Sequence, residues 1–161
     1  MKKHLPNAIT CLNLLSGCIA LYFAFNQHLN YAAYMVGIAA ILDFMDGLLA
    51  RALKAYSEIG KQLDSLADMV SFGVVPGTIL FGLLTRADAA PTGIPEDILP
   101  FFGFIVTIFS ALRLAKFNID TRQAESFIGV PTPACSIFIA SLPLLLEASP
   151  VLYEDFILNP F

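Results

Sequence analysis

Residues 4–42 read HLPNAITCLNLLSGCIALYFAFNQHLNYAAYMVGIAAIL and contain no Asp, Glu, Lys or Arg. This stretch is long enough for two bilayer crossings of about 20 residues each. Its one strongly polar part, NQHLN at residues 26–30, suits a tight turn at the membrane interface. The stretch therefore predicts a helical hairpin, with one span near residues 6–25 and a second near residues 31–50.

The rest of the chain has the same apolar character. Of its 161 residues, 57 % are hydrophobic and 14 % charged, and the mean hydropathy is +0.74, well outside the balance of soluble domains. Further uncharged runs cover residues 69–85, 98–112 and 126–146, and each reaches span length when flanking residues are included. We therefore expect an all-α integral membrane protein, a polytopic helical bundle with five visible spans that forms one domain over residues 1–161.

The charged residues indicate the orientation of this bundle. Lys and Arg accumulate on the cytoplasmic side of short membrane loops, and eight of the nine fall on one side: Lys2, Lys3, Arg51, Lys54, Lys61, Arg113, Lys116 and Arg122. The opposite side holds Arg86 with Asp88, Glu96, Asp97, Glu147, Glu154 and Asp155. We therefore expect a cytoplasmic N-terminus in the cytoplasmic membrane. A net charge of -4 without a basic block argues against nucleic acid as a partner.

Four aspartates lie where the second and third predicted spans meet the cytoplasm. Because residues three and four apart share a helix face, each pair belongs to a longer stripe. One stripe contains Asp43, Asp46, Gly47 and Ala50, and the other contains Gly60, Asp64, Asp68 and Ser71. The two stripes lie on consecutive helices, so they can face each other.

Such a cluster of carboxylates requires cations or protons, because one ionised Asp inside a span costs about 2.5 to 3.5 kcal/mol on insertion scales. Oxygen ligands suit Mg²⁺, Mn²⁺ or Ca²⁺, and the lack of nearby His or Cys argues against zinc or copper. Two ions about 3.5 to 4 Å apart can grip phosphate oxygens and a leaving group. The alternative is a set of solvated boundary aspartates paired with Arg51, Lys54 and Lys61.

The same residues resemble a family signature. The pattern Asp43-x-x-Asp46-Gly47-x-x-Ala50-Arg51, eight residues, then Gly60-x-x-x-Asp64-x-x-x-Asp68 resembles that of the CDP-alcohol phosphatidyltransferases at all eight specified positions. Four further stretches resemble the integral-membrane, serine-accepting branch of this family: residues 6–10 (PNAIT), 71–73 (SFG), 113–118 (RLAKFN) and 129–133 (GVPTP). Family members usually have six transmembrane helices, so a sixth is missing or truncated here, where residues 156–158 only begin an apolar segment.

The resemblance implies a homodimeric enzyme that transfers the phosphatidyl group of CDP-diacylglycerol to the hydroxyl of L-serine and releases CMP at the cytoplasmic interface. It implies that Asp43, Asp46, Asp64 and Asp68 hold two ions of Mg²⁺ or Mn²⁺, and that Asp68 is also the general base.

The resemblance extends to the substrate contacts. The expected contacts of CDP-diacylglycerol are Asn7, Thr10, Gly47, Ala50, Arg51 and Gly60, and those of serine are Arg113, Lys116 and Asn118. Simpler roles stay open for several of these residues. Asn7 and Thr10 can serve helix packing, and the basic residues can be determinants of topology.

Three other functions remain as alternatives. A sister enzyme using glycerol 3-phosphate or inositol phosphate would share the eight positions, but its site should be more basic. An intramembrane prenyltransferase binds diphosphate through Asp-rich motifs that are spaced much farther apart. A cation transporter would carry charges near the bilayer midplane, often in repeated halves, whereas these acids lie at one interface and no repeat is visible.

Overall fold

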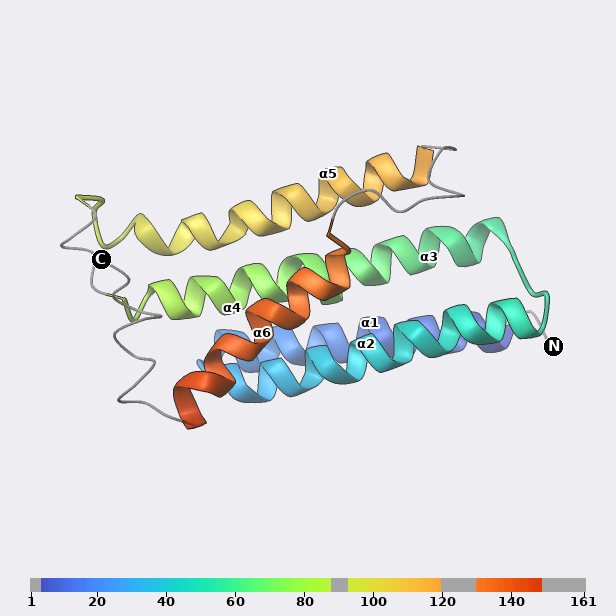
Figure 1. Cartoon of the computed structure of the whole chain (residues 1–161), viewed down its shortest axis with the longest axis horizontal. Coiled ribbons are helices and arrows are strands. Elements are labelled where there is room, and N and C mark those ends of the chain that lie inside the picture. The colour runs from blue at the N-terminus through green and yellow to red at the C-terminus, as the bar shows by residue number, and fades with distance from the viewer. Residues whose placement is uncertain (1–3, 88–92, 120–129, 149–161) are drawn as a thin grey trace.

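The computed structural model describes residues 4–87, 93–119 and 130–148, and in these residues it is helical and contains no strand (Figure 1). The predicted hairpin is confirmed as α1 (His4–Phe25) and α2 (Leu29–Ala52), which lie side by side. Each helix extends a little beyond the predicted span. The turn between them contains Gln27 in a left-handed conformation, with φ of 62°.

The third span is longer than the uncharged run that predicts it. It consists of α3 (Glu58–Asp68), a π-helical segment η1 (Met69–Val74) and α4 (Val75–Leu84), which together form one 27-residue helix. The helix begins before the uncharged run because Ser57 caps it, its hydroxyl accepting a hydrogen bond from the Gly60 amide at 3.0 Å. Asp64 and Asp68 therefore lie inside a continuous helix.

The π-helical segment lies directly before Pro76, whose ring nitrogen cannot donate to the preceding turn. A wider turn of this kind adjusts the backbone where a regular α-helical bond is lost. A neighbouring helix stabilises this wider turn, because Thr107 Oγ1 donates a hydrogen bond to the carbonyl of Gly73 at 2.9 Å. The irregular segment thus begins immediately after Asp68 and is held from the side.

Four helical stretches within the described ranges are long and apolar enough to cross a membrane: His4–Phe25, Leu29–Ala52, Glu58–Leu84 and Leu99–Ile119. The last combines a 3₁₀ segment η3 (Leu99–Phe104) with α5 (Ile105–Ile119). The fifth apolar helix, α6 (Thr132–Ala148), has 17 residues and crosses obliquely over α2 (Figure 1). Residues 126–129 of the predicted fifth span, the apolar segment at 156–158 and part of the GVPTP motif lie outside the described residues.

Small residues fill the contacts between helices. Ala20 of α1 and Ala32 and Ala39 of α2 are fully buried, which lets the two backbones approach closely. A side chain at Gly17 would collide with Ser71 Oγ, so α1 is equally close to η1. Large apolar side chains such as Ile41 and Phe44 point outward instead. This arrangement suits a lipid surround and fixes the third helix against the hairpin.

Candidate active site

Three carboxylates from two helices converge at one end of the bundle. Asp43 of α2 and Asp64 and Asp68 of α3 are all half-buried, and one oxygen of each lies within 4.8 Å of the others. The two stripes expected from the i, i+3 and i, i+4 spacings therefore do face each other. Three carboxylate oxygens at this separation form a donor set that suits a hard divalent cation.

Asp46 lies beside this triad of Asp43, Asp64 and Asp68 but is not part of it. Its side chain is 5 % exposed, and within the described chain Oδ2 has no hydrogen-bond partner although it is shielded from solvent. A buried carboxylate oxygen without a donor is costly. The fourth aspartate of the signature thus presents an unsatisfied oxygen next to the triad, which fits a site that takes up a cation.

The carboxylates open onto a pocket of about 610 Å³, a size typical of small-molecule sites. We call it the acidic pocket. Nine of the residues expected from the sequence line it: Asn7, Thr10, Asp43, Asp46, Gly47, Ala50, Arg51, Gly60 and Asp64. Asp68 is not part of this lining and reaches the pocket through its contacts in the triad.

The two signature glycines differ in what surrounds them. A Cβ added at Gly47 would meet nothing within 4 Å, so this glycine faces the open space of the acidic pocket. A Cβ at Gly60 would lie 2.9 Å from Asn7 Oδ1 and 2.9 Å from Ser57 Oγ. Gly60 therefore makes room for Asn7 of α1, whereas Gly47 leaves room for a ligand.

The basic residues near the acidic pocket do not neutralise its aspartates. In the described part of the chain, no ion pair joins these carboxylates to Arg51, Lys54 or Lys61. Arg51 lines the pocket and donates from Nε to the Gly47 carbonyl at 3.1 Å. The interpretation of the aspartates as a surface ion-pair cluster therefore receives no support from the geometry.

The three residues expected to bind serine are not part of the pocket lining. Asn118 instead joins α5 to α3, because its Nδ2 donates to Ser65 Oγ at 2.9 Å. Its backbone carbonyl accepts from Lys61 Nζ at 3.4 Å. Arg113 and Lys116 also belong to α5, whose Phe117 does line the pocket.

The structure adds residues that sequence reasoning missed. Lys61 and Tyr56 line the acidic pocket, and no spacing rule marks them. Asn13 of α1 is fully buried and donates from Nδ2 to Asp68 Oδ1 at 3.5 Å, while its backbone carbonyl accepts from Ser71 Oγ at 3.2 Å. One signal was present, because Asn13 follows Thr10 by three positions and so extends a polar face of α1.

Comparison with known proteins agrees with this geometry. The sequence profile described as CDP-alcohol phosphatidyltransferase matches residues 3–159, which is almost the whole chain. The chain belongs to this family. It is therefore a member of an enzyme family of the membrane, and its apolar helices mark it as an integral membrane protein. The family differs from the prenyltransferases and transporters considered from the sequence.

Several relatives bear the name CDP-diacylglycerol–serine O-phosphatidyltransferase. The Bacillus subtilis protein is 32 % identical over 144 residues, covering 87 % of this chain and 75 % of the relative. The Helicobacter pylori (strain J99) protein is 34 % identical over 149 residues, covering 87 % and 57 %. The Mycobacterium leprae protein is 35 % identical over 145 residues, covering 86 % and 46 %. The chain thus spans about half the length of the latter two. No solved structure matches the chain significantly.

Proposed function

We propose that this chain transfers the phosphatidyl group of CDP-diacylglycerol to the hydroxyl of L-serine, giving phosphatidylserine and CMP. One observation carries the proposal. Seven of the eight signature positions line a single pocket, and the eighth, Asp68, meets Asp43 and Asp64 behind it. The names of the Bacillus, Helicobacter and Mycobacterium relatives support serine as the acceptor.

In this proposal the triad holds a divalent cation, Mg²⁺ or Mn²⁺, and Asp46 supplies a further carboxylate for a second ion. When bound, such a cation offsets the charge of the diphosphate and of the departing CMP. The support is the set of three carboxylate oxygens within 4.8 Å, together with the unsatisfied Oδ2 of Asp46. The donor set contains only oxygen, which suits these ions better than zinc.

Asp68 is the proposed general base. The serine oxygen forms a bond to the phosphatidyl phosphorus, the bond from that phosphorus to the CMP oxygen breaks, and the serine hydroxyl proton passes to the Asp68 carboxylate. Asn13 is the proposed positioning residue for this carboxylate, since its amide lies 3.5 Å from Oδ1. The buried hydrogen bond from Ser71 to the Asn13 carbonyl keeps α1 in place beside it.

The remaining lining residues are suited to CDP-diacylglycerol. Gly47 leaves space beside α2 for the nucleotide. The bond from Arg51 Nε to the Gly47 carbonyl holds the guanidinium at the pocket, and its other donors suit a phosphate. Asn7 and Thr10 of α1 also line the pocket.

Serine also needs a cation for its carboxylate. The sequence favours Arg113 for this role, whereas the pocket lining favours Lys61, which lies between Gly60 and Asp64. We include both residues in the proposal, with Lys61 in contact with the pocket and Arg113 on the adjoining helix α5.

The positive-inside rule supports a pocket that opens to the cytoplasm. Lys54, Lys61 and Lys116 all belong to helix ends or turns on the side of the acidic pocket, and Arg86 lies at the far end of α4. This orientation would give soluble serine and CMP direct access while the acyl chains stay in lipid. A homodimer remains a prediction from the family.

The proposal is tested by measuring acceptor preference with purified full-length chain, CDP-diacylglycerol and Mn²⁺ or Mg²⁺. Serine, glycerol 3-phosphate and inositol phosphate are offered separately, and CMP release is measured together with the labelled lipid product. We expect CMP release only with serine, and none from an Asp64→Asn control. Faster release with a phosphorylated acceptor, or release that needs neither acceptor nor metal, would contradict the proposal.

A further inference from the structure

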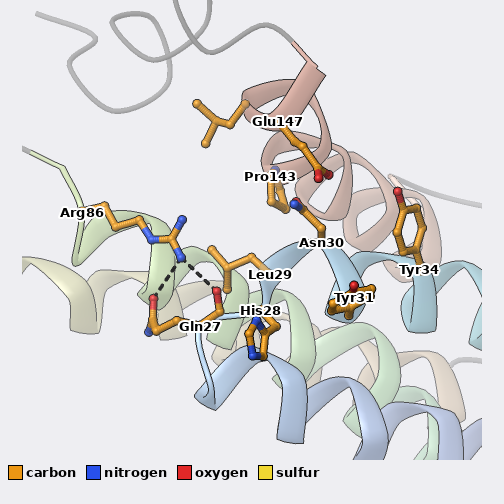
Figure 2. A pocket seen from close by; sticks show the side chains of 10 residues that line it. Gln27, His28, Leu29, Asn30, Tyr31, Tyr34, Arg86, Pro143 and Glu147 are labelled. Atoms are coloured by element: carbon orange, nitrogen blue, oxygen red, sulfur yellow. Dashed lines mark hydrogen bonds between the residues drawn. The ribbon is translucent and has the colours of Figure 1, made fainter.

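A second pocket, of about 520 Å³, is lined by residues at the opposite end of the bundle, and Figure 2 shows its side chains from close by. We call it the distal pocket. Its walls come from the α1–α2 turn, the first turns of α2, the residue Arg86 after α4 and the end of α6. Leu29 in this pocket and Asp46 in the acidic pocket are 17 positions apart on α2, which is about 25 Å along a helix. The two pockets are therefore separate.

One wall of the distal pocket holds a fixed positive charge. Arg86 donates from Nη2 to the backbone carbonyl of Gln27 at 3.0 Å and to Gln27 Oε1 at 3.4 Å. The left-handed backbone of Gln27 turns both acceptors toward the arginine. Within the described ranges, Nε and Nη1 of Arg86 donate to no protein acceptor. The guanidinium is therefore oriented by the protein and keeps donors for a ligand.

The negative charge of the distal pocket lies on a different helix. Glu147 of α6 is exposed, and in the part of the chain that the structure describes it forms no ion pair with Arg86. Figure 2 shows Leu29 between the two side chains, with Arg86 on the α4 side and Glu147 on the α6 side. Opposite charges held apart across one pocket are complementary to a ligand that carries both charges itself.

The surroundings of the distal pocket are those of a membrane interface. Tyr31 and Tyr34 line it and are 57 % and 53 % exposed, as expected for tyrosines at the headgroup level. From Tyr34, the side chains of Ile38, Ile41 and Met45 continue along α2 at helical spacing, and all three are exposed. A polar pocket thus continues into an apolar helix face of the kind that hydrocarbon chains cover.

We propose that the distal pocket binds the headgroup of a zwitterionic phospholipid, with its phosphodiester on Arg86 and its ammonium group on Glu147. The rings of Tyr31 and Tyr34 flank the ammonium group, and an acyl chain follows the exposed face of α2. Free serine carries the same two kinds of charge, but the adjoining apolar face favours a lipid. This inference does not depend on the proposed reaction.

Native mass spectrometry of the full chain in detergent tests the site, with phosphatidylethanolamine and phosphatidylglycerol of identical acyl chains as the two probes. Phosphatidylglycerol has the phosphodiester but lacks the ammonium group. Glu147→Gln is the sharpest variant, because among the residues that the structure describes this side chain forms no hydrogen bond or ion pair that the substitution would remove. Glu96→Gln is the matched control, since Glu96 is an exposed carboxylate in the segment between α4 and η3.

We expect Glu147→Gln to weaken phosphatidylethanolamine binding about tenfold, the value of one hydrogen bond to a charged group, and to leave phosphatidylglycerol binding unchanged. Arg86→Gln should weaken both lipids, and Glu96→Gln neither. Circular dichroism verifies that each variant is folded, and CMP release with serine should stay within about twofold of the parent chain because the acidic pocket is intact.

Three results would overturn the proposal. The first is equal binding of both lipids by the parent chain, and the second is unchanged phosphatidylethanolamine binding by Glu147→Gln. The third is Glu147-dependent binding of free serine without any such binding of lipid, which would assign the pocket to a soluble amino acid. Because the readout is lipid binding, loss of the proposed transferase activity would leave this test valid.

Discussion

The acidic pocket and the distal pocket have similar volumes but are built in different ways. The first is built mainly from faces of α1, α2 and α3, and its carboxylates repeat at three- and four-residue intervals. The second is built from the α1–α2 turn and from residues at the ends of α2, α4 and α6. One pocket concentrates like charges and the other separates unlike charges. Like charges gathered inside a membrane bundle need cations or protons to offset their repulsion, whereas unlike charges that are held apart are complementary to a zwitterionic ligand.

The largest expected effect comes from a substitution in the acidic pocket that should lower turnover and keep substrate binding. Asp68→Asn removes the proposed base but keeps its shape, so turnover should fall by about 10²–10⁴. Binding of CDP-diacylglycerol, measured with the purified chain, should be retained. Near-normal turnover by Asp68→Asn would show that Asp68 is not the base. Glu147→Gln, at the distal pocket, is the control variant, and its turnover should persist.

The next effect tests whether Asn13 positions Asp68. Asn13→Leu keeps a side chain of similar size but removes the amide, so kcat should fall about tenfold with little change in KM for CDP-diacylglycerol. Asn13→Gln should restore part of the loss if the amide is what matters. Equal losses in both variants, or a rise in KM alone, would assign Asn13 to packing.

A smaller effect compares the two candidate anchors for the serine carboxylate. Lys61→Ala and Arg113→Ala should each raise the KM for serine more than the KM for the lipid, by about tenfold for the true anchor. Kinetics at saturating CDP-diacylglycerol measure this difference. Because Lys61 lines the pocket, we expect its substitution to give the greater effect. A substitution that raises the KM for serine and the KM for the lipid equally would show that the residue is not a specific anchor for serine.

The smallest effect distinguishes the two signature glycines. Gly47→Ala adds a methyl group to open pocket space, so the melting temperature should hold while KM for CDP-diacylglycerol rises a few-fold. Gly60→Ala places a Cβ 2.9 Å from the side-chain oxygens of Asn7 and Ser57. Moving Ser57 Oγ away weakens the cap of α3, which should cost about 1 kcal/mol of stability. Thermal unfolding of the two variants separates these cases, and a stable Gly60→Ala would contradict the close approach.

Much of the hairpin and of the acidic pocket was predictable because both depend on regular spacing. Uncharged runs predict the spans, and helical periodicity brings Asp43 to face Asp64. The uncharged run at residues 69–85 does not mark where α3 begins, because four charged residues of the helix precede it: Glu58, Lys61, Asp64 and Asp68. Ser57, which caps the helix, marks the start instead. Pro76 predicts a kink, but a proline alone does not predict a π-helical segment beginning after Asp68.

Other features depend on tertiary contacts that no local pattern contains. Helical spacing places Asn13 on the polar face of α1 that contains Thr10, but only the tertiary structure brings it beside Asp68. The distal pocket joins Gln27, Arg86 and Glu147, which lie far apart in sequence without fixed intervals. Arg113 matches a family motif, yet of the two residues only Lys61 lines the acidic pocket. Tertiary contacts such as the hydrogen bond from Lys61 Nζ to the Asn118 carbonyl, and not sequence spacing, decide which cation lies there.

The central claim is that carboxylates from α2 and α3 together hold a divalent cation, and Mn²⁺ binding measured by electron paramagnetic resonance tests it most directly. The full chain should bind Mn²⁺ competitively with Mg²⁺. Asp43→Asn on one helix and Asp64→Asn on the other should each weaken binding strongly, while Glu96→Gln should bind like the parent chain. Unchanged Mn²⁺ binding in both folded aspartate variants would contradict the account.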